Sequence, residues 1–562
     1  DKYSSTILFS QENKSTKGRK IMTFLNEKIR IMTELLSGRT IAERKAIEKI
    51  SFAPCGYKTE NRPPKDAEMK PCNNETLSLP VDGHGWFTFE LDVPEKTEQY
   101  EYFLSVVNGK ENDWDAVNPQ YTVFIDGDTA YQGLDTHHHR TPLSAGHHVI
   151  NVYYYAGMRP NENGSVAIRT QFFLDKLDRE VYGLYYDVLV PYEAMKELPD
   201  GSIDRYTLQN ILSRAEMLID FRHADDVEGF HRSVKEARAF LKTELYDKEF
   251  GSNGEELALF GHTHIDVAWL WTLAQTEEKA QRSFATVIRF MERFPEYQFM
   301  SSQPQLFWYI KKNDPKLYEK IKERVKEGRF EVEGAMWLEA DTNLSSGEGL
   351  VRQILYGKKF MKDEFGIESN ILWLPDVFGY SGALPQILKK SGVDRFFTCK
   401  LSWCETNKFP HDHFLWQGID GSEIFATLSQ SYVNTLEPKR IMATCKEHID
   451  KAYSPMTLST FGYGDGGGGP TEDMLEQYRR LEKGIPGMPK VHIEHAGSAM
   501  TKIENNFRKN AKELRFTPRW KGELYFEMHR GTYTSMAHNK KCNRKSELLY
   551  QTLENAAVTA YT

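Results

Sequence analysis

The chain has 562 residues, a net charge of −8, 40% hydrophobic residues and 27% charged residues. This length predicts several domains rather than one. The 72 basic and 80 acidic residues form no long basic stripe and no apolar run is long enough to cross a bilayer, so we expect no nucleic-acid or membrane partner.

Cysteine usage bears on the cellular compartment. Six cysteines are scattered without close pairs, which argues against a disulfide-built secreted protein and favours a reducing, cytoplasmic location. The first residue, Asp1, leaves the true N-terminus open, and composition leaves a homo-oligomer open.

The first half of the chain changes from helical to strand periodicity and back. Apolar residues at helical spacing that end at Gly38 predict a helical segment over residues 1–50. Short β-branched and aromatic runs predict an antiparallel β-sandwich over 51–175, and amphipathic stretches predict a helical linker over 176–250. The strand runs are WFTFELDV, EYFLSVVN, QYTVFIDGD, HHVINVYYYAG and SVAIRTQFFLD.

Strand and helix alternate in the second half. We expect a multidomain α/β protein whose catalytic domain, residues 251–520, is a seven-stranded parallel β/α barrel. Residues 521–562 predict the beginning of a helical bundle, and we expect the chain to be truncated there. The apolar runs are ELALF, RFEVEGAMW, NILWL, RFFTC, EIFATL, MTLSTFGY and KVHI.

The segment ELALFGHTHIDVAWLW runs from an apolar strand into three polar residues. In an extended strand, His262, His264 and Asp266 share one face, at the end where barrel enzymes carry their chemistry. Two imidazoles and a carboxylate suit zinc or a similar ion. The alternative is a buried polar trio that hydrogen-bonds to the backbone.

Two other strands end at acids. Asp376 follows Pro375 after the run Ile371 to Leu374, where it can ligate a metal or attack carbon, or serve as a helix cap or turn residue. Asp465 precedes four glycines, which let the backbone approach a ligand closely or form a flexible turn. A phosphate loop is disfavoured because no Gly-Lys-Ser/Thr follows. Retaining glycoside hydrolysis needs two carboxylates, and a divalent ion beside the nucleophile adds a Lewis acid that can hold sugar hydroxyls.

Four motifs of the sequence are GHTHIDVAWLW, WLPDVFGYS, FGYGDGGGGPT and ELYFEMHRGTYTSMAH. Together they resemble glycoside hydrolase family 38, the class II α-mannosidases, in their cytosolic and bacterial branch. The resemblance implies a retaining, exo-acting α-mannosidase that removes terminal α-linked mannose from oligosaccharides through a covalent mannosyl-aspartate intermediate. It also implies one divalent cation, Zn²⁺ with Co²⁺ as the alternative.

The resemblance assigns roles by position. His264 and Asp266 would bind zinc, Asp376 would bind zinc and act as nucleophile, and Asp465 would be the general acid and base. The sugar subsite would be lined by His262, Trp269, Glu339, Asp341 and Trp403. The family's fourth ligand comes from a His-Asp motif beyond the HRGTYTS segment, so we expect the isolated chain to bind metal weakly and to be poorly active.

Two other functions stay open. A metal-dependent carbohydrate deacetylase or amidohydrolase on a related barrel would use similar ligands, and a non-catalytic carbohydrate-binding fragment would use none of the chemistry. Linkage preference and natural substrate are not fixed by the sequence. In the β region, we expect His137, His138 and His139 to be an exposed loop triplet rather than a metal site.

Overall fold

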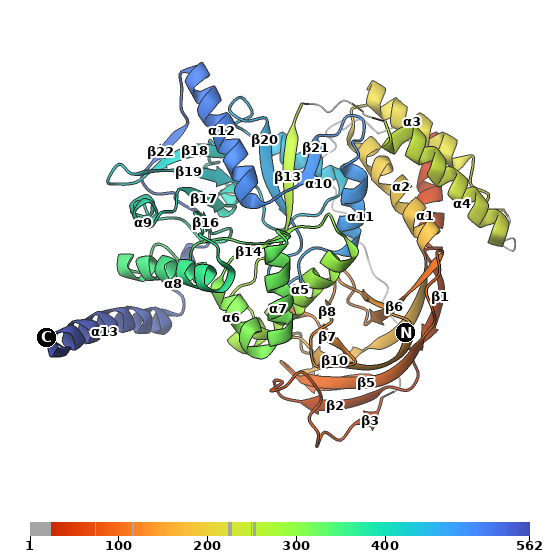
Figure 1. Ribbon diagram of the computed structural model, residues 1–562, viewed down its shortest axis with the longest axis horizontal. Helices are drawn as coiled ribbons and strands as arrows, with labels where there is room; N and C mark the ends of the chain where they lie inside the picture. The colour runs from red at the N-terminus through yellow and green to blue at the C-terminus, as the bar shows by residue number, and fades with distance from the viewer. Residues whose placement is uncertain are drawn as a thin grey trace.

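The computed structural model describes residues 24–72, 75–114, 117–222, 227–248, 250 and 254–561. A β-sandwich, a group of helices and a mixed α/β region follow one another (Figure 1). Helix α1 (Phe24–Ser37) ends before Gly38, as predicted, while residues 1–23 of the predicted segment lie outside the described residues. The helical prediction is wrong at β1 (Ile41–Ala46), because this charged segment forms an exposed edge strand on β12.

The sandwich consists of two antiparallel sheets with strand orders β1-β12-β6-β9 and β3-β2-β5-β10-β7-β8. Their inward faces share one core, which includes Phe87, Val123 and Val152 from one sheet and Leu104 and Phe172 from the other. The strand periodicity therefore predicted this region correctly. The strands are β2 (Ser51–Cys55), β3 (Lys70–Pro71), β4 (Thr76–Pro80), β5 (His84–Val93), β6 (Tyr100–Val107), β7 (Gln120–Ile125), β8 (Gln132–Leu134), β9 (Arg140–Leu143), β10 (Gly146–Tyr155), β11 (Ser165–Arg169) and β12 (Gln171–Asp178).

Helices α2 (Arg179–Glu197), α3 (Ile203–Glu216) and α4 (Val227–Leu241) fill the predicted linker, followed by a π-helical turn at Lys242–Tyr246. Helix α2 begins directly after β12 because the Asp178 side chain accepts the first free backbone N–H groups of the helix. It packs against α1, α3 and α4 on one side and against α10 and α11 on the other. The helices thus join the sandwich to the α/β region.

The α/β region contains two five-stranded sheets, ordered β15-β14-β13-β20 with β21 also on β13, and β16-β17-β19-β18-β22. All seven apolar runs of the sequence lie on strands. The strands are β13 (Glu256–His262), β14 (Phe299–Ser301), β15 (Phe330–Val332), β16 (Ile371–Trp373), β17 (Arg395–Thr398), β18 (His413–Gln417), β19 (Glu423–Leu428), β20 (Met456–Phe461), β21 (Lys490–Ile493) and β22 (Arg519–Lys521).

The predicted closed barrel of seven parallel strands is not confirmed. Among the described residues, the two sheets are linked by a single parallel bridge between Gly334 and Leu372, and no ladder joins β19 to β20. Several strands are only three residues long, and β18 runs antiparallel to β19. Short strands and an antiparallel hairpin leave the region as two open sheets.

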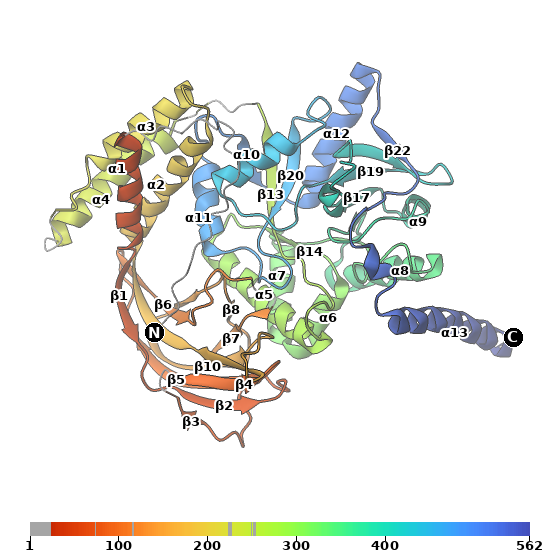
Figure 2. The same cartoon turned by 180° about the vertical axis from the view of Figure 1, so that it is seen from behind.

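Helices cover these sheets (Figures 1 and 2), and the parallel pairing of β13 with β20 brings their carboxyl ends to one edge. The segments that follow His262 and Phe461 are therefore neighbours. The helices are α5 (Leu273–Arg293), α6 (Pro304–Asn313), α7 (Pro315–Lys326), α8 (Gly347–Phe365), α9 (Leu384–Lys390), α10 (Pro438–Glu447), α11 (Glu472–Leu481) and α12 (Ala496–Leu514), with 3₁₀ turns at Lys400–Trp403 and Arg530–Tyr533.

Helix α13 (Ala537–Tyr561) projects from the α/β region and buries none of its residues (Figure 2). It is held to the α/β region by an ion pair between Arg352 and Glu554 and by the Arg544 guanidinium, which donates to the Leu344 carbonyl at 2.9 Å. In the described part of the chain, no helix combines the length and apolar character that crossing a membrane requires.

Candidate active site

His264 lies just beyond the end of β13, beside two acids. Ligand-type atoms of His264, Asp266 and Asp465 all lie within 4.8 Å of one another. His264 is buried, and its Nε2 lies 3.4 Å from Asp266 Oδ1. The parallel ladder between β13 and β20 explains the arrangement, because the two strands deliver their following loops to the same edge.

Asp376 reaches the same group from the end of β16. Its Oδ2 lies 3.8 Å from His264 Nε2, so the structure brings the predicted metal ligands together. Its Oδ1 forms an ion pair with Lys400. The Lys400 ammonium also lies 3.9 Å from the centre of the Trp403 ring and is held between a carboxylate and an aromatic face.

Asp376 and Asp465 share one hydrogen-bonding partner. Tyr432 Oη lies 2.9 Å from Asp376 Oδ1 and 3.1 Å from Asp465 Oδ1. Tyr432 is the hydrogen-bond donor to both carboxyls and has one proton to share between them. Burial raises the pKa of Asp465 to about 6, with a further contribution from the carboxylates of Asp266 and Asp376. This raised pKa suits Asp465 to the role of proton donor.

A cavity of about 370 Å³ adjoins these residues, and Glu339 and Asp341 line it together with His264, Asp266 and Asp376. Glu339 Oε2 lies 3.0 Å from His264 Nδ1, and its Oε1 accepts a hydrogen bond from Ser302 at 3.0 Å. Glu339 and Asp341 are two of the predicted sugar-subsite residues. The cavity thus combines a histidine with four carboxylates.

The other three predicted subsite residues do not line this cavity. His262 is the last residue of β13, donates from Nδ1 to the Met300 carbonyl at 3.0 Å and packs against Trp373. Burial lowers its pKa to about 4, so it is a neutral core residue below the site. Trp269 is half-exposed beside Trp114 of the sandwich, and Trp403 covers Lys400.

The group around His264 fits a divalent cation. His264 Nε2 and Asp266 Oδ2 are buried and make no hydrogen bond. Burial opposes a charge on His264, yet the carboxylates of Glu339 and Asp266 raise its pKa well above the usual range, which reflects surplus negative charge. Imidazole and carboxylate donors suit zinc and similar ions. Neither His529 nor His538 belongs to the groups of described residues that can hold an ion.

Sequence reasoning missed Lys400 and Tyr432. Lys400 follows β17, and Tyr432 follows β19, each shortly after the carboxyl end of a strand with a parallel neighbour. Asp376 was predicted because it also lies shortly after a strand. The same criterion would have found Lys400 and Tyr432, but only acids and histidines were considered at strand ends.

A second buried group, Asp412, His413 and His448, is used within the fold. Asp412 Oδ2 accepts the Ile449 N–H at 2.7 Å and lies 2.6 Å from His448 Nδ1. His448 Nε2 donates to the Ser454 carbonyl at 2.8 Å. Burial lowers the pKa of His413 to about 4, which keeps it neutral. These contacts tie β18 to the loop after α10.

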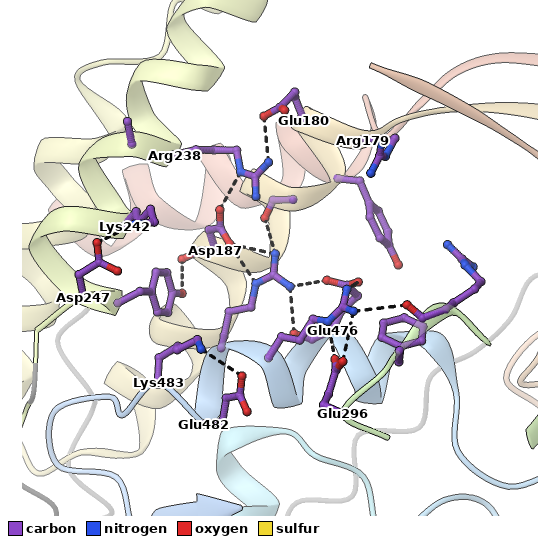
Figure 3. A pocket seen from close by; sticks show the side chains of 18 of the residues that line it. Arg179, Glu180, Asp187, Arg238, Lys242, Asp247, Glu296, Glu476, Glu482 and Lys483 are labelled. Carbon is purple, nitrogen blue, oxygen red and sulfur yellow. Dashed lines mark hydrogen bonds and ion pairs between the residues drawn. The ribbon is translucent and has the colours of Figure 1, made fainter. Parts of the chain in front are cut away.

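A larger cavity, of about 1040 Å³, is lined by charged residues of α2, α4 and α11 (Figure 3). Arg238 donates to Asp187 at 2.9 Å and to Glu180 at 2.8 Å. Arg480 donates to the other Asp187 oxygen at 2.9 Å and pairs with Glu476. The acids and bases that line this cavity pair with one another. Their ion pairs connect helices α2 and α4 to α11 of the α/β region.

Comparisons with known proteins agree with this layout. Residues 256–523 match the family model for the glycosyl hydrolases family 38 N-terminal domain. Alpha-mannosidase of Saccharomyces cerevisiae is 36% identical over 394 residues, which cover 67% of this chain and 36% of the relative. Alpha-mannosidase G of Dictyostelium discoideum is 37% identical (66% of this chain, 33% of the relative). Alpha-mannosidase 2C1 of Homo sapiens is 39% identical (55% and 30%). The chain spans about a third of the length of these relatives.

Two carboxyl groups close enough to flank one glycosidic bond are the arrangement by which glycoside hydrolases act. The chain belongs to glycoside hydrolase family 38, as its four motifs indicated.

Proposed function

We propose that this chain carries the site of a retaining α-mannosidase that removes terminal α-linked mannose from oligosaccharides. The observation that carries the proposal is the hydroxyl shared by Asp376 and Asp465. Two oxygens that hydrogen-bond the same atom at 2.9 and 3.1 Å lie no more than about 6 Å apart. Retaining glycosidases separate their carboxyls by ~5–5.5 Å, whereas inverting enzymes need ~6.5–9.5 Å to admit water.

The two carboxyls have different roles in this reaction. Asp376, ionised beside Lys400, attacks the anomeric carbon and forms an ester as the glycosidic C–O bond breaks. Asp465 gives its proton to the departing oxygen. Asp465 then takes a proton from water as that water attacks the anomeric carbon, which releases mannose and frees Asp376.

His264, Asp266 and Asp376 would hold the cation, for which zinc is proposed and cobalt is the alternative. Such an ion supplies Lewis-acid chemistry to sugar oxygens. Glu339 and Asp341 would accept hydrogen bonds from sugar hydroxyls in the cavity. His262, Trp269 and Trp403 stay predicted subsite residues, and the half-exposed Trp269 and Trp403 are proposed to meet a sugar at the rim.

Three broader predictions also stay proposals. The sandwich (51–175), helical linker (176–250) and catalytic region (251–520) are proposed as domains, with β1 (Ile41–Ala46) added to the sandwich because it pairs with β12. A closed barrel is proposed only for a form in which β19 and β20 pair. A cytoplasmic compartment is supported by the six cysteines, all of which are free thiols.

The test is the stereochemistry of hydrolysis. The 562-residue chain, supplied with Zn²⁺, is incubated with an aryl α-mannoside while proton NMR follows the first mannose released. We expect the α-anomer to appear first, and a chelator to stop the reaction. Release of the β-anomer contradicts retention, and release of acetate from an acetylated oligosaccharide, without mannoside cleavage, contradicts the glycosidase proposal.

A further inference from the structure

The β-sandwich contacts the loop that carries Asp465. Strand β8 lies against helix α5 of the α/β region (Figure 1), and the residues after β8, 135–139, reach the glycine loop 464–469. We expected His138 to be exposed, but this was wrong, because it is 4% exposed and enclosed between the two regions. The sandwich therefore lies within reach of the catalytic carboxyl.

His138 is hydrogen-bonded on both ring nitrogens. Its Nδ1 lies 2.9 Å from Asp135 Oδ1, and its Nε2 lies 2.9 Å from the carbonyl oxygen of Pro470, directly after the glycines. Both partners are acceptors, so both nitrogens must donate, and the ring is an imidazolium. Burial opposes this charge, yet the Asp135 carboxylate raises the His138 pKa. A charged donor thus holds one end of the loop.

The other end of the loop is held by Arg282 of α5. Its guanidinium donates to the Gly466 carbonyl at 2.6 Å and lies 3.5 Å from Asp135 Oδ2. Asp135 is therefore paired with both cations that contact the loop. Nearby, the His137 ring stacks on Tyr463 with the ring centres 3.6 Å apart and the planes within 4°.

The loop is closed by its own backbone hydrogen bonds, between Tyr463 and Gly469 in both directions and from the Gly467 N–H to the Gly464 carbonyl, each at 2.9 Å. Asp465 has a left-handed φ of 54°, which disfavours a residue with a side chain, and Gly466, Gly468 and Gly469 also have positive φ. The glycines offer no side chains to pack, so the packing of the loop comes from neighbouring residues. A Cβ at Gly468 would come within 2.6 Å of Asp135 Oδ2, which shows how closely the sandwich fits.

We propose that the sandwich positions the acid/base of the active site, with His138, Asp135 and Arg282 as positioning residues that hold the Asp465 loop from both ends. This inference rests on the proposed function, because it takes Asp465 to be the general acid. The accessory sandwich then forms part of the catalytic apparatus rather than a separate module. Its loss would misplace the proton donor while leaving Asp376 in place.

The test exploits leaving-group chemistry. A 2,4-dinitrophenyl α-mannoside needs no proton to depart, whereas an α-linked mannobiose does. In the full chain, His138→Gln removes the charged donor, and Asp135→Asn removes the charge with almost no change of shape. The matched control is His147→Gln, a histidine of the same sandwich whose side chain is 56% exposed.

We expect His138→Gln and Asp135→Asn to lower kcat/KM about tenfold on mannobiose, part of the ~10²–10⁴-fold that general acid catalysis contributes, and less than about threefold on the dinitrophenyl substrate. Amide hydrogen exchange should quicken at Gly467 and Gly469, while His147→Gln should change neither readout. Equal losses on both substrates, or unchanged exchange in the loop, would overturn the inference. If the unaltered chain hydrolyses neither mannoside, the proposed function fails, and the exchange comparison alone decides this inference.

Discussion

Lys400 and Asp376 form an ion pair from which water is nearly excluded, since their side chains are 3% and 14% exposed. The rings of Trp403 and Phe378 lie 3.9 and 5.0 Å from the ammonium nitrogen. A buried charge pair is costly to break because the remaining charge loses its partner. Lys400 therefore orients the Asp376 carboxylate.

Replacing this lysine tests that role. Lys400→Met should lower kcat for an aryl α-mannoside by about 10²–10³-fold, the loss seen when a preorganised electrostatic contact is removed, and Lys400→Arg should retain more activity. Steady-state kinetics on the 562-residue chain measures the effect. Lys408→Met, at an exposed position, is the control. Unchanged kcat in Lys400→Met would show that the ion pair has no catalytic part.

The pKa of Asp465, raised to about 6 by burial, predicts the alkaline side of the pH profile. The general acid must be protonated, and its protonated fraction falls as pH rises through that pKa, so kcat/KM should decline above about pH 6. A profile from pH 4 to 9 on mannobiose checks this. Asp465→Asn should abolish the limb together with most of the activity. A limb that persists in that variant would assign the titration to another group.

Tyr432→Phe should move the alkaline decline of kcat/KM to higher pH. The Tyr432 hydrogen bond lowers the Asp465 pKa, so its loss should raise that pKa and shift the decline of kcat/KM to higher pH. The rate itself should fall, because Asp376 also loses a hydrogen bond. Comparison of the two pH profiles measures both effects. A shift toward lower pH would contradict the shared hydroxyl.

Metal content tests the group around His264. His264→Ala and Asp266→Asn should each lower the zinc retained after dialysis and lower aryl-mannosidase activity, since second-sphere changes alone cost ~10–100-fold in affinity. Elemental analysis gives the zinc-to-protein ratio. His413→Gln, in the other buried group, should leave that ratio unchanged. If His413→Gln lost zinc while His264→Ala and Asp266→Asn retained it, the ion would lie at His413 and not at His264.

The core beneath the site should be sensitive to truncation. Trp373 is fully buried and stacks on Phe397 with ring centres 3.7 Å apart. Trp373→Ala should cost about 3–5 kcal/mol in the free energy of unfolding, and Trp373→Phe less, because a large side chain leaves a cavity. Urea unfolding measures both. A cost below about 1 kcal/mol would mean that the stack contributes little.

Elements with strong periodicity were predictable from the sequence, and short ones were not. The seven apolar runs of the α/β region all became strands, but β14, β18 and β22 were missed. Their three to five residues carry no period of their own, and tertiary pairing defines them. Barrel closure was overestimated for the same reason, since strand count alone does not specify which edges pair.

The site was predictable where strand ends carry unusual residues. His264, Asp266 and Asp465 converge because the parallel strands β13 and β20 share one edge, and Asp376 reaches them from the end of β16 in the other sheet. Strand alternation predicted that His262 shares a face with His264. His262 is the last residue of β13, and its ring packs against Trp373 in the core. The charge network around His138 could not be foreseen, because its partners come from three separate segments.

In the proposed reaction, Asp376 attacks the anomeric carbon. Incubation of the chain with a 2-deoxy-2-fluoro or 5-fluoro mannosyl fluoride, followed by proteolysis and mass spectrometry, tests it directly. We predict one sugar ester per chain on the peptide that contains Asp376, with no label in Asp376→Asn. Label on another carboxylate, or turnover of the reagent that leaves no ester, would contradict the account.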